Sequence, residues 1–204
     1  MDIGHYITLA IKTIFTDNML LAYFLGMCSF LACSKHFKTA TGLAMATTFI
    51  AGVTVPLNWI IREYVLRKGA LAWAGLPGLD LSYLSFILFI ATIAAFTQVT
   101  EMIVDRYAPA LYASVGIFLP LITANCAVLG ATFFMDQRDY TFGESLVYGF
   151  SAGGGWGLAI ITLAALRKKM WYSNPPDPLK GLGMSMITTG FMAMAFMAFA
   201  GIAF

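Results

Sequence analysis

Apolar residues gather along the chain in about six blocks that charged loops separate. Each block approaches the roughly 20 residues with which an α-helix crosses a hydrocarbon core. A transmembrane β-barrel would alternate apolar and polar residues in segments of about ten, and the chain has no such alternation. The blocks are 6–34, 41–61, 81–104, 111–135, 145–166 and 181–204. This pattern predicts an all-α integral membrane protein with six transmembrane helices.

The first and fourth blocks contain residues that interrupt a helix. The amphipathic stretch 6–15 is followed by Asp17-Asn18, which is typical of a helix cap. A new helix is therefore predicted over residues 19–34, and its 16 residues extend only about 24 Å, short for a full span. The fourth block carries Gly116 and Pro120. We expect both helices to be broken in the middle of the membrane.

These interruptions divide the chain into two similar halves of three spans each. Each half begins with an interrupted block that contains a thiol in its second part, Cys28 or Cys126. Because three spans is an odd number, similar halves must be inserted in opposite directions. We therefore expect one membrane domain, 1–204, made of inverted repeats at about 1–105 and 106–204. Interrupted helices at matching positions of inverted repeats indicate a binding site near the bilayer midplane.

Glycines concentrate in the fifth block at a density that favours close helix packing. Small residues let two helix backbones approach closely inside a membrane. We expect this helix to be buried against a neighbour. The glycines are Gly149, Gly153, Gly154, Gly155 and Gly157.

The distribution of lysine and arginine residues predicts the orientation of the chain in the membrane, because cytoplasmic loops carry more of these residues than loops on the opposite side. Loops one, three and five hold seven of them, and the opposite side holds five. We therefore expect these three loops in the cytoplasm and both termini in the periplasm. The seven are Lys35, Lys38, Arg106, Arg167, Lys168, Lys169 and Lys180, and the five are Lys12, Arg62, Arg67, Lys68 and Arg138.

The composition agrees with a membrane protein and excludes one class of partner. Of the 204 residues 60% are hydrophobic and only 11% are charged, far from the composition of a soluble domain. The net charge of +2 is small, and no basic run with interleaved aromatic residues occurs. Nucleic-acid binding is therefore not expected.

The three cysteines all lie in apolar segments, which argues against a disulfide framework and leaves packing or metal ligation. Cys33 follows Cys28 by five residues, about 140° away around a helix, so the two cannot bind one ion from a regular helix. We expect Cys33 to act as a small packing residue. For Cys28 and Cys126, packing and metal ligation both remain open at this stage.

The remaining chemistry favours iron over zinc or copper, if a metal is bound. No helix carries a cluster of His or carboxylate residues, and His5 and His36 lie near helix ends, where we expect solvated side chains. Two thiolates leave iron under-coordinated, because iron–sulfur clusters use four ligands. A partner subunit of similar build would supply the other two. Such a centre at the midplane would relay electrons between carriers on the two sides.

Two further polar residues stand inside apolar blocks. Glu101 lies one turn before Asp105 in the third block, and an acidic residue at membrane depth indicates either cation handling or pairing with a basic neighbour. Asn125 precedes Cys126, and we expect its side chain to satisfy backbone groups freed at the break or to bond across helices.

Four segments together resemble the membrane-subunit family of the bacterial sodium-translocating NADH:quinone oxidoreductase, and within it the group of E subunits. They are Phe24–Cys28, Gly116–Cys126, Gln137–Tyr140 and Gly181–Gly183. The resemblance covers essentially the whole chain. The two cysteine motifs are shared with the related Rnf electron-transport complex, whereas Gln137–Tyr140 and the region 55–80 favour the NADH:quinone enzyme.

The resemblance implies a [2Fe–2S] cluster between the pseudo-symmetric D and E subunits. Its ligands in this chain would be Cys28 and Cys126, and the D subunit would supply the others. It also implies a six-subunit complex of the bacterial inner membrane, in which NADH, flavins and quinone bind to other subunits while sodium is exported. Glu101 matches an acidic position proposed to help sodium pass. The chain has no NADH or flavin motif, as expected for one relaying subunit without a complete active site.

Alternative functions make different demands on the thiols. An Rnf-type ferredoxin:NAD complex would use the same two cysteines. A secondary transporter with broken helices that bind a small solute would tolerate serine at Cys28 and Cys126. A helical scaffold for assembly would keep electron transfer when Cys28 becomes alanine.

Overall fold

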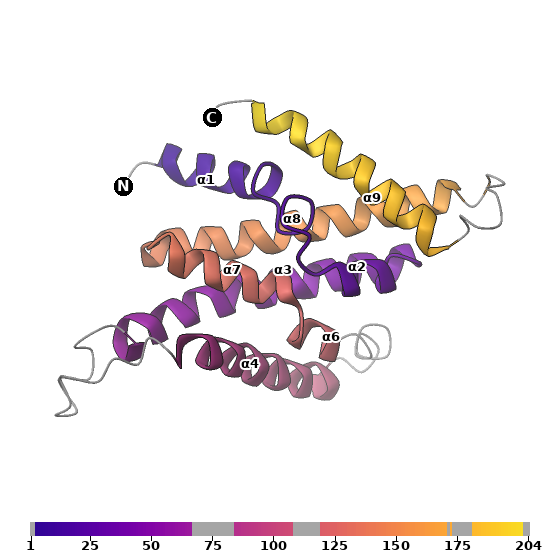
Figure 1. Cartoon of the computed structure of the whole chain (residues 1–204). Coiled ribbons are helices and arrows are strands. Elements are labelled where there is room, and N and C mark those ends of the chain that lie inside the picture. The colour runs from indigo at the N-terminus through magenta and orange to yellow at the C-terminus, as the bar shows by residue number, and fades with distance from the viewer. Residues whose placement is uncertain (1–2, 67–83, 108–118, 171, 173–180, 202–204) are drawn as a thin grey trace.

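The computed structural model describes residues 3–66, 84–107, 119–170, 172 and 181–201 (Figure 1). These residues form helices joined by turns and contain no β-strand, which confirms the all-α prediction for this part of the chain. The elements are α1 (Ile3–Phe15), α2 (Met27–Cys33), α3 (Phe37–Ile61), the π-helical η1 (Arg62–Leu66), α4 (Ser85–Tyr107), α6 (Leu119–Thr123), α7 (Cys126–Gln137), α8 (Phe142–Met170), α9 (Leu182–Met197) and the 3-10 turn η6 (Ala198–Gly201).

Three of these helices are long and apolar enough to cross a membrane. They cover 37–66, 85–107 and 142–170, which correspond to the second, third and fifth apolar blocks. The helices α1 and α9 are apolar but shorter. Gly116 and the start of the fourth block, most of the loop before α4, and Lys180 lie outside the described residues.

The helices α3 and α8 form the centre of the molecule, with α4 on one side and α1 and α9 on the other (Figure 1). Three glycines of α8 face α3. A Cβ added at Gly153 would lie 2.6 Å from the Thr48 Cα, and one added at Gly157 would lie 3.0 Å from the Ala44 Cβ. At Gly149 the Ala51 carbonyl oxygen would be 2.8 Å away.

This pairing confirms that the glycine-rich helix is buried against a neighbour. The contact positions fall along α3 as they rise along α8, so the two helices run antiparallel. A backbone surface without side chains allows the two helix axes to come close together. Trp156 of α8 and Ile50 of α3 belong to the same hydrophobic core, and each has 1% or less of its surface exposed.

The helix predicted over residues 19–34 is wrong at its beginning, because α2 starts only at Met27. The Asn18 side chain accepts hydrogen bonds from the backbone of Leu20 and Leu21, as a cap residue does, but the turn that follows does not continue as a helix. Phe24 at φ 57° and Gly26 at φ 80° both have left-handed backbones, which stop helix propagation. Residues 16–26 therefore form a non-helical connection between α1 and α2.

The second thiol segment also lies between two helices. The helix α6 ends at Thr123, and α7 begins at Cys126 with Asn125 as its N-cap residue. The Asn125 Oδ1 atom accepts a hydrogen bond of 3.0 Å from the Ala127 amide. Asn125 thus satisfies a backbone group at the interruption, one of the two roles predicted for it.

A polar cluster ties together the ends of α3 and α7 and the connection that follows α1. Arg138 donates to Asp17 over 2.9 Å and to the Tyr140 hydroxyl over 3.2 Å. Arg62 pairs with Asp136 at 2.5 Å and also with Asp139. Burial disfavours the charge of Arg138, but the bonds to Tyr140 and Asp17 outweigh it and raise the pKa of the guanidinium. The cluster holds this end of the bundle together.

Candidate thiol site

The two thiols predicted to act together occupy the first turns of two short helices. Cys28 is the second residue of α2, and Cys126 is the first residue of α7. The first amides of a helix have no partner inside the helix, and the positive end of its dipole favours negative charge. Both thiols thus stand where a helix begins, each directly after or within the interruption of its apolar block.

A hydrogen bond joins the two thiol segments. The Gly26 amide donates to the Cys126 Sγ atom over 3.1 Å, and Gly26 is the N-cap residue of α2, two positions before Cys28. Its left-handed backbone directs this amide away from a regular helical turn. Residues 100 positions apart in the sequence thus meet at the beginnings of α2 and α7.

Gly26 fits a space that admits no side chain. A Cβ at this position would lie 2.6 Å from the Trp156 Nε1 atom and 2.7 Å from the Asn125 Oδ1 atom. Both residues are buried, and each has a nitrogen donor, Trp156 Nε1 and Asn125 Nδ2, that no described partner accepts from. The surroundings of the Cys126 segment are therefore tightly packed and contain buried N–H groups.

The exposure of the cysteines separates them into two kinds. Cys28 is exposed, Cys126 is half-buried, and Cys33 is in the core with 2% of its surface exposed. Cysteine is among the most frequently buried residues, so an exposed thiol in an apolar chain is unusual. Cys33 lies where a packing residue is expected, whereas Cys28 and Cys126 are accessible to a ligand or a second chain.

A complete metal site does not form within the described ranges, in which no three His, Cys, Asp or Glu residues gather. Cys28 and Cys126 are the candidates for half of the ligand set of an iron–sulfur cluster, since both thiols are accessible and the Cys126 sulfur accepts a backbone N–H bond. Hydrogen bonds of this kind to sulfur are one of the features that tune such clusters.

The other candidate residues lie elsewhere. Glu101 is half-buried in α4, six positions before the helix ends at Tyr107. His5 is solvent-exposed and contacts Glu144 over 2.8 Å, and His36 is the exposed N-cap residue of α3. Both histidines thus lie at or near helix ends with exposed side chains, as expected.

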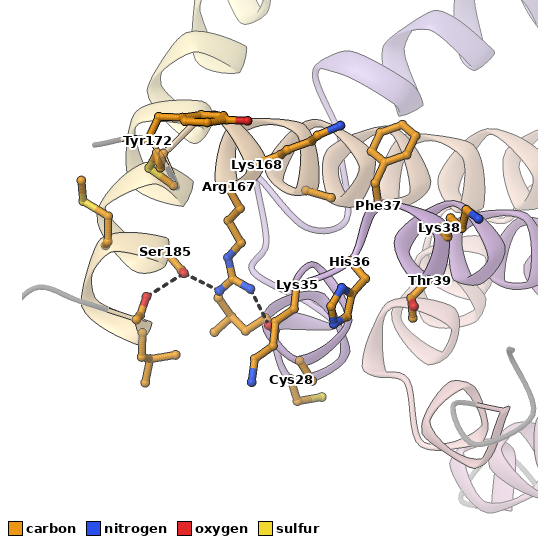
Figure 2. A pocket seen from close by; sticks show the side chains of 17 residues that line it. Cys28, Lys35, His36, Phe37, Lys38, Thr39, Arg167, Lys168, Tyr172 and Ser185 are labelled. Carbon is orange, nitrogen blue, oxygen red and sulfur yellow. Dashed lines mark hydrogen bonds between the residues drawn. The ribbon is translucent and has the colours of Figure 1, made fainter. Parts of the chain in front are cut away.

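Beside Cys28 the structure contains a hollow of about 1850 Å³ between α2, the start of α3, the end of α8 and the start of α9 (Figure 2). Arg167 lies in it and donates to the Leu31 carbonyl oxygen over 3.1 Å and to the Ser185 hydroxyl. It therefore connects α8 to α2, which carries Cys28, and to α9.

The sequence analysis missed two residues of this region. It used Arg167 only to predict the orientation in the membrane, and it assigned no structural role to Gly26. A glycine two residues before a cysteine, with its tolerance of a left-handed backbone, is a signal that could have identified Gly26.

Comparison with known proteins identifies the family of this chain. A family model described as Rnf-Nqr subunit, membrane protein, matches residues 6–203. Over 198 residues the chain is 58% identical to the E subunit of the Na(+)-translocating NADH-quinone reductase of Marinobacter nauticus, and 56% identical to the proteins of that name from Hahella chejuensis and Proteus mirabilis. Each comparison covers 97% of this chain and 98% of the relative. The chain therefore belongs to the Rnf-Nqr family of membrane subunits.

Proposed function

We propose that this chain is the E subunit of a sodium-translocating NADH–quinone reductase and relays electrons through an iron–sulfur cluster that Cys28 and Cys126 hold. The observation that carries this proposal is the contact of the two thiol segments at Gly26 and Cys126. The relatives with 56–58% identity bear the name of that enzyme's subunit. The description of the matching family also includes Rnf subunits, which leaves an Rnf-type complex as the alternative.

The proposed membrane architecture is six spans in two inverted repeats, about 1–105 and 106–204, within one domain. Three relationships support it. The helices α3 and α8, which hold equivalent places in the two halves, pack antiparallel at the centre. The first block of each half contains a thiol at the start of a short helix, α2 or α7. The beginnings of these two helices meet, as the inverted arrangement requires.

The proposed cofactor is a [2Fe–2S] cluster, which accepts and releases one electron when bound. This chain would contribute two accessible sulfurs, one of which accepts a hydrogen bond from the Gly26 amide. Four ligands are needed. We propose that the D subunit of the same complex supplies the other two and covers the exposed Cys28.

The proposed location is the bacterial inner membrane, with both termini in the periplasm and six different subunits in the complex. The hollow beside Cys28 supports the orientation, because it brings together basic residues of loop one, Lys35 and Lys38, and of loop five, Arg167 and Lys168. These two loops were predicted to share the cytoplasmic side. NADH, flavins and quinone are proposed to bind in other subunits.

The test is iron content and electron paramagnetic resonance of the purified complex. We expect Cys28→Ser and Cys126→Ser each to remove the iron of one cluster and its signal. Cys33→Ala is the matched control, since Cys33 lies five residues from Cys28 in the same helix but is buried in the core. It is expected to keep both iron and signal.

The subunit composition of each variant must be checked by gel electrophoresis, so that loss of iron is not confused with loss of subunits. If both serine variants assembled and contained the wild-type amount of iron, the cluster would not be bound by these residues. A secondary transporter or a structural scaffold would then explain the chain better.

A further inference from the structure

We propose that the hollow beside Cys28 binds the phosphate headgroup of an anionic phospholipid. Five basic side chains line it, and the described lining residues include no carboxylate. They are Lys35, His36, Lys38, Arg167 and Lys168 (Figure 2). Its volume of about 1850 Å³ exceeds the roughly 300–1,000 Å³ of ordinary small-molecule sites.

The part of the hollow that Arg167 and Lys168 line lies at the membrane surface, as the length of α8 indicates. The 29 residues of α8 extend about 43 Å, longer than a hydrocarbon core of about 30 Å. Arg167 and Lys168 stand in the last turn of this helix. They therefore reach the depth at which phospholipid headgroups lie.

The lining is apolar as well as basic, which matches an amphiphile better than a free ion. Phe37 is 49% exposed and Leu182 is 65% exposed, and both line the hollow. Leu31, Ala32 and Met184 add further apolar surface. A phospholipid can place its phosphate among the cationic groups and its acyl chains against these side chains.

The two helices that begin at the hollow add to its attraction for anions. The N-cap residues of α3 and α9, His36 and Gly181, both line it, and within the described part of the chain neither provides a side-chain capping bond. Helix N-termini carry partial positive charge and unpaired N–H groups. Basic hollows between transmembrane helices on the cytoplasmic side are typical binding places for anionic lipids.

Arg167 is held differently from the lysines. Its guanidinium contacts two neutral oxygens, of Leu31 and Ser185, so its full charge is available to an anion while its position is fixed. Because this residue also connects helices, it is unsuitable for a binding test. Lys35, Lys38 and Lys168 line the hollow and can be changed without removing a described contact.

The test is native mass spectrometry of the purified complex with dioleoyl phosphatidylglycerol, and with dioleoyl phosphatidylcholine for comparison. We expect the triple variant Lys35→Gln, Lys38→Gln, Lys168→Gln to bind phosphatidylglycerol about tenfold more weakly than the wild type, with phosphatidylcholine unaffected. The matched control is Lys169→Gln, which removes a charge one residue along α8 that does not line the hollow. It is expected to leave binding unchanged.

Two further arms distinguish a lipid headgroup from free phosphate and from a protein partner. The triple arginine variant at the same positions keeps the charge, so it is expected to bind phosphatidylglycerol like the wild type. Raising the salt concentration should weaken phosphatidylglycerol binding to the wild type and to the arginine variant alike. The lipid proposal is overturned by any of three results: undiminished phosphatidylglycerol binding in the glutamine variant, inorganic phosphate that binds the hollow as tightly as the lipid, or release of a neighbouring subunit by the glutamine substitutions. The last result would assign the hollow to a protein partner.

Discussion

The backbone amide of Gly26 donates to the sulfur of Cys126 across 3.1 Å and so fixes the start of α2 against the start of α7. Cys28 follows Gly26 by two residues, so the position of one thiol depends on the surroundings of the other. The relationship requires a left-handed backbone at residue 26 and space for no side chain. Both requirements make Gly26 the residue at which the thiol pair is most sensitive to change.

Gly26→Ala is expected to disrupt the thiol site without removing a ligand. The left-handed backbone alone costs a side-chain-bearing residue about 1–3 kcal/mol, and the added Cβ would collide with Trp156 and Asn125. We expect the iron content and the resonance signal of the purified complex to fall. Gly4→Ala is the control, since no atom lies within 4 Å of the added carbon there. A wild-type signal in Gly26→Ala would show that the contact with Cys126 is dispensable.

Gly153→Ala and the neighbouring Gly154→Ala are expected to have opposite effects on stability. The Cβ at Gly153 would lie 2.6 Å from the Thr48 Cα, so α3 and α8 would have to separate, at a cost of about 1–3 kcal/mol. At Gly154 the added Cβ meets nothing within 4 Å, and alanine is favoured over glycine in a helix by roughly 0.5–1 kcal/mol. The apparent unfolding temperature of the complex, measured by fluorescence, distinguishes the two variants. Equal values would contradict the close approach of α3 and α8.

Arg167→Ala is expected to loosen α2. The substitution removes the donors to the Leu31 carbonyl oxygen and to the Ser185 hydroxyl. Each such bond contributes roughly 1.5–3 kcal/mol, since its donor is charged. Hydrogen–deuterium exchange should become faster over residues 27–33 and over the start of α9. Lys169→Ala, which removes a cation of the same turn, serves as the control, and equal exchange in the two variants would argue against a role for Arg167 in holding α2.

Glu101→Gln tests the proposed involvement of this residue in sodium passage. Removing the charge while keeping the shape should weaken attraction for a cation, so the sodium concentration that gives half-maximal quinone reduction should rise several-fold. Iron content should stay unchanged, because Glu101 lies in α4 and is not one of the residues proposed to bind the cluster. Asp105→Asn, at an exposed carboxylate one turn later, is the comparison. Unchanged sodium dependence would assign Glu101 a structural role.

Local patterns in the sequence were sufficient for much of the fold. The glycines of α8 predicted its burial because small residues act through their own backbone, whichever helix they meet. The capping role of Asn125 could be predicted because an asparagine side chain accepts hydrogen bonds from backbone amides of the turn that follows it. The separation of Cys28 from Cys33 also followed from helix geometry alone, and the structure leaves Cys28 exposed and Cys33 in the core.

What the sequence could not supply are features that depend on distant residues. The connection over residues 16–26 was predicted as helix after Asn18, because the apolar run gives no sign that Phe24 adopts a left-handed backbone against its propensity. The Gly26 bond to Cys126 and the Arg167 bond to Leu31 join positions 100 and 136 residues apart. No pattern of neighbouring residues predicts either hydrogen bond, because the packing of the helices determines which acceptor atom each donor meets.

The glycine contact between α3 and α8 also restricts how the subunit can deform. Two backbones in direct contact have no long side chains between them whose rotamers could adjust during a sliding motion. The helices α3 and α8 should therefore move together as one rigid body. In its most apolar stretch α4 buries only 17% of its residues, compared with 61% for α8. Any rearrangement that accompanies turnover should then appear as displacement of the peripheral helix α4 relative to a static centre.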